Sequence, residues 1–197
     1  MPLGANKVAL FGASADTGSA VLLSTATASS SASLEFTLPT AYKQVVFGFY
    51  NLTPTTEDGG STNFVFQVNA SGGSGFNETI TSTAFNTYHN EADSDSLLAY
   101  NTGYDQAQGT NYEVLYPAPG NESDEGCVGE LKLFNPASTT YVKHFYSTLQ
   151  GNYYSPDYSL AHYQSGYINT TTNLSEISFK MSSGNISSGT IKMWGIK

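Results

Sequence analysis

Arginine is missing from the sequence: all seven basic residues are lysines, against 16 acidic residues, and the formal net charge is −9. Proteins that bind nucleic acids carry a basic surface whose arginines and lysines neutralise phosphates. Arginine also supplies the paired hydrogen bonds that recognise phosphate and carboxylate groups. The composition therefore argues against nucleic acid as a partner, and anionic membrane surfaces would repel the chain.

Cysteine occurs once, at Cys127, so no intramolecular disulfide can form. No motif places a base beside this thiol, and we expect a buried, inert side chain. The absence of disulfides fits assembly in a reducing cytosol. Long apolar runs are also lacking: the stretch that follows Lys7 is about five residues, shorter than the roughly 7–15 of a signal peptide. We therefore expect neither a cleaved signal nor insertion into a membrane.

Charged residues make up only 12% of the chain, whereas aromatic residues make up 13%, with 14 tyrosines and 11 phenylalanines. Such a chain favours strands and turns, because helices would lack their usual charged positions. Several segments alternate apolar and polar residues; Leu131 and Leu133 would face inward while Glu130 and Lys132 share the outer face. The sequence predicts an all-β protein, an antiparallel β-sandwich of jelly-roll or concanavalin-like type.

Two regions differ in composition. Residues 1–33 are small and weakly apolar, and the run from Ser24 to Ser33 contains only Ser, Thr and Ala. This region predicts an extended leader that lies along another chain or sheet and docks the protein in a larger particle. Strand patterns begin at Leu34, and at this length the rest fits one domain. We therefore predict a leader over residues 1–33 and a β-sandwich domain over residues 34–197.

The end of the chain predicts a closing hairpin. Ile177, Phe179 and Met181 alternate with polar residues, and Ile191 and Met193 repeat the pattern after a Ser/Gly/Asn loop. Lys180 opposite Lys192 would place like charges side by side, which is unfavourable. We therefore predict a hairpin that closes the sheet, with Phe179 opposite Ile191 and Ile177 opposite Met193.

No motif for catalysis, for a metal or for a cofactor is found. His89, His144 and His162 lack the close spacing common in metal sites. Two acidic clusters, residues 90–95 and 121–126, could bind calcium through their oxygens, but they lack the twelve-residue ligand order, so we expect solvated loops. A glycoside hydrolase would need two carboxyl groups facing each other across a cleft, and it is the least supported alternative.

Tyrosines gather in the stretch from Tyr153 to Tyr163, and the candidate contact residues are Tyr153, Tyr154, Tyr158 and Tyr163. A tyrosine ring combines a flat apolar surface with a hydroxyl group, which suits both protein interfaces and sugars. The rings could instead cover the end of the sandwich or pack within a subunit interface. Both interpretations stay open at the level of the sequence.

Several segments resemble structural proteins of tailed bacteriophage particles, particularly those of marine phages. The opening, residues 3–13, is similar to a leader at the start of phage tail-associated and fibre-like proteins. Residues 34–45, residues 129–134 and the closing Gly189-Thr-Ile-Lys-Met-Trp-Gly-Ile196 resemble a recurrent phage sandwich, whose members usually end in Gly-Thr-Ile-x-Leu-Tyr-Gly-Ile. The resemblance implies a jelly-roll or lectin-like sandwich, frequent oligomerisation and no catalytic residues.

The sequence thus favours a non-enzymatic virion structural protein at the particle surface, either a capsid decoration protein or a component of a short tail fibre or tip. Its expected partners are other virion proteins and further copies of itself, in a homo-oligomer such as a trimer. It would assemble in the host cytoplasm without a cofactor. The alternative is a carbohydrate-binding, lectin-like module, and the two hypotheses are compatible if the particle attaches to host surface glycans.

Overall fold

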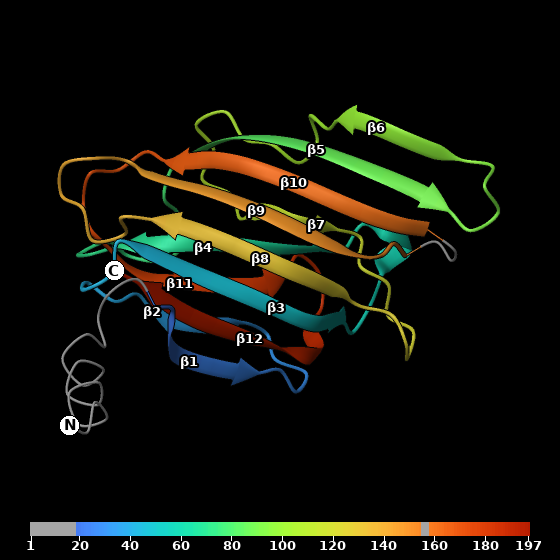
Figure 1. The fold of residues 1–197 in the computed structure, drawn as a ribbon, viewed down its shortest axis with the longest axis horizontal. Coiled ribbons are helices and arrows are strands. Elements are labelled where there is room, and N and C mark those ends of the chain that lie inside the picture. Colours follow the sequence, from blue (N-terminus) through green and yellow to red (C-terminus); the bar gives the residue numbers. More distant parts are fainter. Residues whose placement is uncertain (1–18, 155–157) are drawn as a thin grey trace, which may run out of the picture.

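The computed structural model describes residues 19–154 and 158–197, which form two antiparallel sheets packed face to face (Figure 1). This arrangement confirms the predicted all-β sandwich. Within the described residues the one helical element is the 3-10 turn η1 (Asp58–Gly60), and no helix is long and apolar enough to span a membrane.

The larger sheet has eight strands and the smaller has four among the described residues. In spatial order, the large sheet consists of β1 (Val21–Thr27), β12 (Ile186–Ile196), β3 (Gln44–Pro54), β8 (Cys127–Phe134), β9 (Lys143–Asn152), β10 (Tyr158–Ile168), β5 (Ile80–Asn90) and β6 (Ser96–Tyr100). The small sheet consists of β2 (Leu34–Thr37), β11 (Leu174–Met181), β4 (Asn63–Ala70) and β7 (Glu113–Pro117).

Phenylalanine rings fill the space between the sheets. Phe179, on β11, is fully buried and packs against rings from both layers at centroid distances from 5.0 Å to 6.5 Å. The two-residue period of the strands aims every second side chain at this core. Burying one such ring stabilises the fold by roughly 1.5–3 kcal/mol. The partners of Phe179 are Phe36, Phe47, Phe49, Phe64 and Phe66.

The predicted closing hairpin is wrong, because β11 and β12 lie in different sheets. Phe179 on β11 is opposite Phe66 and Leu34, whereas Ile191 on β12 is opposite Phe49 and Ala26. The chain crosses from one layer to the other between the two strands. The apolar faces of β11 and β12 therefore meet across the core rather than side by side. The sequence could not distinguish these arrangements, because both give the same two-residue period.

The sandwich begins ahead of the predicted boundary at residue 34. Strand β1 pairs with β12 from Val21 opposite Gly195 to Thr27 opposite Thr190. The Ser/Thr/Ala run thus supplies part of an edge strand, for which backbone hydrogen bonds suffice. Strand β1 therefore belongs to the sandwich and not to the predicted leader. Residues 1–18 of that leader lie outside the described part of the chain.

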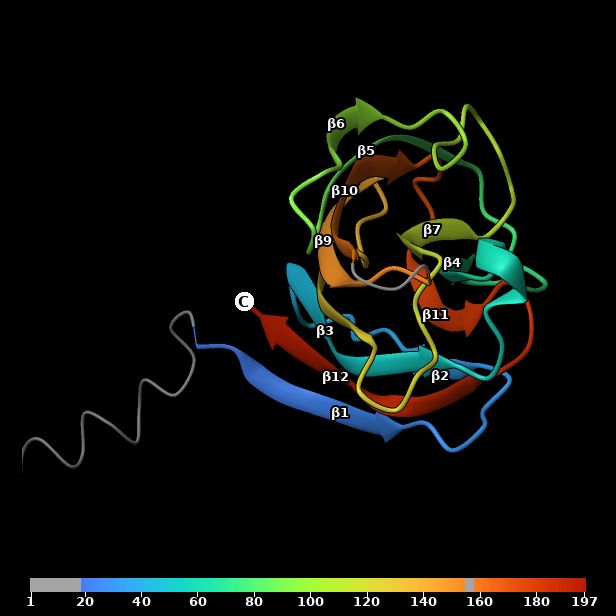
Figure 2. The same cartoon turned by 90° about the vertical axis from the view of Figure 1, so that its right-hand side faces the viewer.

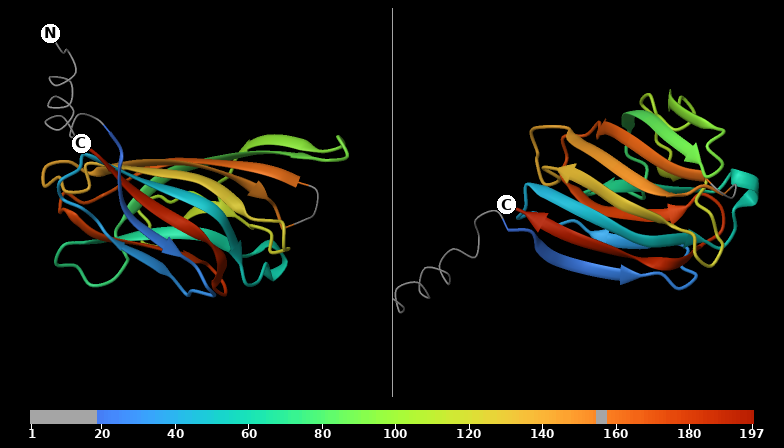
Figure 3. Two further views of the ribbon diagram at one scale, coloured as in Figure 1. Left: turned by 60° about the horizontal axis from the view of Figure 1, so that its bottom comes forward. Right: turned by 45° about the vertical axis from the view of Figure 1, so that its right-hand side comes forward.

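The large sheet curves around the small one, so that β9, β10, β5 and β6 arch over β7 (Figure 2). The segment 101–112 leaves β6 and returns to β7, and it connects the rim of the arch with the small sheet (Figure 3). The inner side of the arch is therefore covered in part by this segment and by the end of β7.

Candidate functional site

A cleft of about 380 Å³ lies under the arch formed by β5, β6 and β10. Its walls come from these strands, from the end of β7 and from the segments that follow β6 and β9. Binding pockets for small ligands have about 300–1,000 Å³ and combine apolar rings with a few polar groups. Five partly exposed tyrosines line this cleft: Tyr88, Tyr104, Tyr153, Tyr154 and Tyr158.

Three of the four tyrosines that the sequence singles out meet in this cleft, namely Tyr153, Tyr154 and Tyr158. The fourth, Tyr163, lies on the opposite face of β10, where its ring stacks on Phe85 with centroids 4.8 Å apart and planes 9° apart. Side chains of a strand alternate between its faces, and Tyr158 and Tyr163 are five positions apart. The structure therefore separates Tyr163 from the other three.

The tyrosine rings support one another at fixed angles. Tyr153 and Tyr154 meet edge to face, with centroids 4.7 Å apart, and Tyr88 on β5 meets Tyr158 on β10 in the same way at 5.5 Å. The ring of Tyr154 also lies against Gly60, where a Cβ atom would collide with it. Edge-to-face contacts of this kind hold aromatic rings in defined orientations. The cleft therefore presents preformed apolar surfaces.

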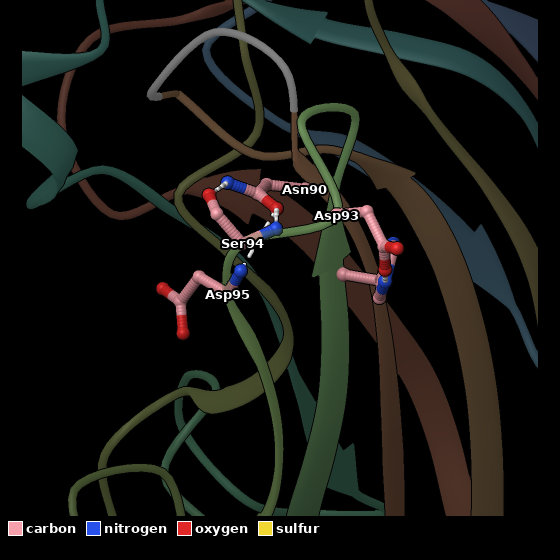
Figure 4. Close-up of polar contacts among 5 residues, drawn as sticks. Asn90, Asp93, Ser94 and Asp95 are labelled. Atoms are coloured by element: carbon pink, nitrogen blue, oxygen red, sulfur yellow. Dashed lines mark hydrogen bonds and ion pairs between the residues drawn. The ribbon is translucent and has the colours of Figure 1, made fainter.

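The polar side of the cleft is organised by the turn between β5 and β6. Asn90 Oδ1 accepts hydrogen bonds from the backbone N–H groups of Ser94 and Asp95, each at 3.0 Å, and Asn90 Nδ2 donates to Ser94 Oγ at 2.9 Å (Figure 4). An asparagine that bonds to backbone groups ahead of it stabilises a tight turn. The carboxylate of Asp95 points away from this turn, and it accepts a 3.0 Å hydrogen bond from the hydroxyl of Tyr158.

The hydroxyls of Tyr104, Tyr153 and Tyr158 stay protonated over the ordinary pH range. The hydrogen bond to Asp95 raises the pKa of Tyr158, with smaller contributions from burial and from the negative charge of Asp95. Burial raises the pKa of Tyr104 and Tyr153. Each hydroxyl can therefore both donate and accept hydrogen bonds. Amide groups of Asn86 and Asn101 add further donors and acceptors to the same cleft.

A buried polar network stabilises one wall of the cleft. Glu113 on β7 is 1% exposed and accepts hydrogen bonds from Ser82 Oγ at 2.8 Å, from Gln106 Nε2 at 2.6 Å and from the side-chain amide of Gln164. Burial raises the pKa of Glu113 to about 7, although the bonds from Ser82 and Gln106 lower it in part. The network fixes the segment 101–112, which carries Asn101 and Tyr104 into the cleft.

His162 lies beside this network without being part of it. It is fully buried on the inner face of β10, and its ring meets that of Tyr104 edge to face at 5.7 Å. Neither ring nitrogen makes a hydrogen bond with a described residue. Burial lowers the pKa of His162 to about 4, so the ring is neutral near neutral pH. It supports Tyr104 from behind as an uncharged side chain.

The other candidate groups are dispersed. Within the described residues no three His, Cys, Asp or Glu side chains come together in a way that could hold a metal ion. Burial raises the pKa of Cys127 to about 12, which keeps the thiol protonated. In the acidic cluster 90–95, Asp93 pairs with His89 at 3.0 Å. Among the described residues that line the cleft, Asp95 is the single carboxylate.

Several cleft residues were not anticipated from the sequence: Tyr88, Tyr104, Asp95, Asn86 and Asn101. One signal could have revealed Tyr88, because Ile80, Ser82, Ala84, Asn86 and Tyr88 occupy alternate positions of β5. No family model matches the sequence, and no curated protein matches it either.

Proposed function

We propose that the protein is a non-catalytic, carbohydrate-binding β-sandwich and that the cleft under β5, β6 and β10 is its binding site. The observation that carries this proposal is the set of five tyrosines around a cleft that also offers Asp95, Asn86 and Asn101. Sugar rings have an apolar C–H face and a rim of hydroxyl groups. A site made of aromatic rings with a few fixed polar groups is complementary to both features.

Each part of the cleft has a defined task in this proposal. The rings of Tyr153 and Tyr154 pack against the C–H face of a sugar unit, and the fixed contact between them limits the entropy lost on binding. Asp95 accepts hydrogen bonds from sugar hydroxyls through the oxygen that Tyr158 does not use. Hydrolysis of a glycosidic bond commonly needs two facing carboxyl groups. Asp95 is the single carboxylate among the described lining residues, which favours binding over cleavage.

The test is a glycan array followed by calorimetry on the glycan that gives the strongest signal. The wild type should bind, Tyr154→Ala should lose at least about tenfold in affinity, and Tyr163→Ala should bind like the wild type. Tyr163 is the matched control because it lies on the other face of β10, outside the cleft. A wild type that binds no glycan, or two variants that behave alike, would contradict the proposal.

The second part of the proposal concerns the setting, and the resemblance to phage structural proteins motivates it. The sandwich would be displayed at the surface of a virion as a capsid decoration protein or a tail fibre or tip component. Its partners would be other virion proteins and further copies of the chain, for example in a trimer. Mass spectrometry of purified particles and light scattering of the isolated protein test this part. A monomer that is missing from the particles would overturn it.

A further inference from the structure

Several carboxylates of the described residues lie in or near the cleft. Asp95 lies in the cleft, and Glu91 and Asp93 are exposed on the same turn. On the other side, Glu57 and Asp58 precede Gly60, which contacts the ring of Tyr154. Acidic residues therefore occur on two of the segments beside the cleft, the turn before β6 and the residues before Gly60.

Lysines are excluded from every segment that forms the cleft. The sequence contains no lysine in residues 44–131 or in residues 144–179, and all the cleft residues fall within these two ranges. Three of the lysines are engaged elsewhere: Lys132 lies over Tyr146, Lys180 over Tyr112 and Lys192 over Tyr50. With arginine absent from the chain, the described residues that line the cleft offer no cationic side chain to an anionic ligand.

Asp95, the one charged group among the described residues that line the cleft, is held by a hydrogen bond and can still accept others. Asp95 Oδ2 accepts from Tyr158, while no described residue donates to Oδ1. A carboxylate forms strong hydrogen bonds with hydroxyl and amide donors, and it repels a second carboxylate or a sulfate at short distance.

From these observations we infer that the cleft selects uncharged glycans, built from neutral hexoses or N-acetylhexosamines, and rejects acidic glycans. This inference rests on the proposed carbohydrate binding and adds the class of ligand to it. Asp95 is the specificity-determining residue: it accepts hydrogen bonds from a neutral sugar and repels an acidic one.

The experiment uses an array with matched pairs of glycans, such as N-acetyllactosamine with its sialylated form and a neutral mannan with a polymannuronate. The wild type should bind the neutral member of a pair at least about tenfold more tightly at low ionic strength, and added salt should reduce the difference. Asp95→Asn keeps an acceptor oxygen and removes the charge, so it should bring the two affinities closer together. Asp124→Asn makes the same change outside the cleft and should leave the ratio unaltered.

The outcomes separate the two claims. Equal or tighter binding of the acidic members by the wild type would overturn the selectivity and leave carbohydrate binding intact. An unchanged ratio in Asp95→Asn would overturn the role of Asp95. If no member of any pair binds to the wild type, carbohydrate binding itself fails, and the selectivity fails with it.

Discussion

The hydroxyl of Tyr158 donates a hydrogen bond to Asp95 over 3.0 Å, and this bond joins the start of β10 to the turn before β6. The same ring packs edge-on against Tyr88 on β5. One side chain therefore fixes both a ring and the carboxylate of the cleft. The orientation of Asp95 depends on a contact made entirely between residues of the proposed binding site.

Tyr158→Phe tests this dependence, because it removes the hydroxyl and keeps the ring. We expect glycan affinity to fall several-fold, since Asp95 loses the donor that orients it, while the melting temperature stays close to that of the wild type. Calorimetry with the best array ligand measures the affinity. Tyr163→Phe removes a hydroxyl from the other face of β10 and should bind like the wild type. Equal affinities in all three proteins would show that the hydrogen bond does not matter for binding.

Phe179→Ala tests the core. Phe179 is fully buried and contacts five other phenylalanines, so its truncation leaves a cavity between the sheets. We expect the free energy of unfolding to fall by about 3–5 kcal/mol in a urea titration. Phe85→Ala is the control, because Phe85 is 44% exposed and loses mainly its stacking on Tyr163, worth roughly 0.5–1.5 kcal/mol. Similar losses in both variants would contradict the assignment of Phe179 to the core.

The class of fold follows from the sequence wherever the interior is apolar. Leu131 and Leu133 are predicted to face inward, and both are fully buried. Glu130 and Lys132 are predicted to share the outer face, where they form an ion pair. In such strands the hydrophobic effect acts on alternate residues, so the period reveals the element and its faces.

The arch over the cleft was harder to predict, because its inner face is polar. Ser82 and Asn86 on β5 point inward, and so do His162 and Gln164 on β10. Polar residues at these inward positions hide the two-residue period of the strands. The two-residue period also does not reveal which strands pair. It shows which face of β11 and of β12 is apolar, but not which strands lie beside them in a sheet.

Glu113→Gln tests the buried carboxyl group. The folded protein holds this pKa at about 7, above the ordinary 4.5, so between these values the folded state keeps a proton that the unfolded chain releases. The contribution of Glu113 to the free energy of unfolding therefore falls as pH rises through this window, by at most about 1.4 kcal/mol per pH unit. Urea titrations from about pH 4 to about pH 8 should show that Glu113→Gln has lost this decline relative to the wild type. A constant difference between the two proteins would mean that Glu113 keeps an ordinary pKa.

His162→Gln tests the opposite effect. Burial lowers the pKa of His162 from 6.5 to about 4, so between these values the unfolded chain binds a proton that the folded state does not. Its contribution to the free energy of unfolding therefore rises with pH, also by at most about 1.4 kcal/mol per unit. In the overlap of the two windows, His162 and Glu113 oppose each other and their slopes largely cancel.

The two variants should therefore tilt the stability profile in opposite directions. In Glu113→Gln only the contribution of His162 remains, so the free energy of unfolding should rise with pH relative to the wild type. In His162→Gln only the contribution of Glu113 remains, so the free energy of unfolding should fall with pH relative to the wild type. The double variant should lose both slopes and run parallel to the wild type in the overlap of the windows, whatever its absolute stability. The profiles come from the same urea titrations. Single variants that both run parallel to the wild type would show that neither group titrates with a shifted pKa, and the polar interior under the cleft would then be more open to water than its burial indicates.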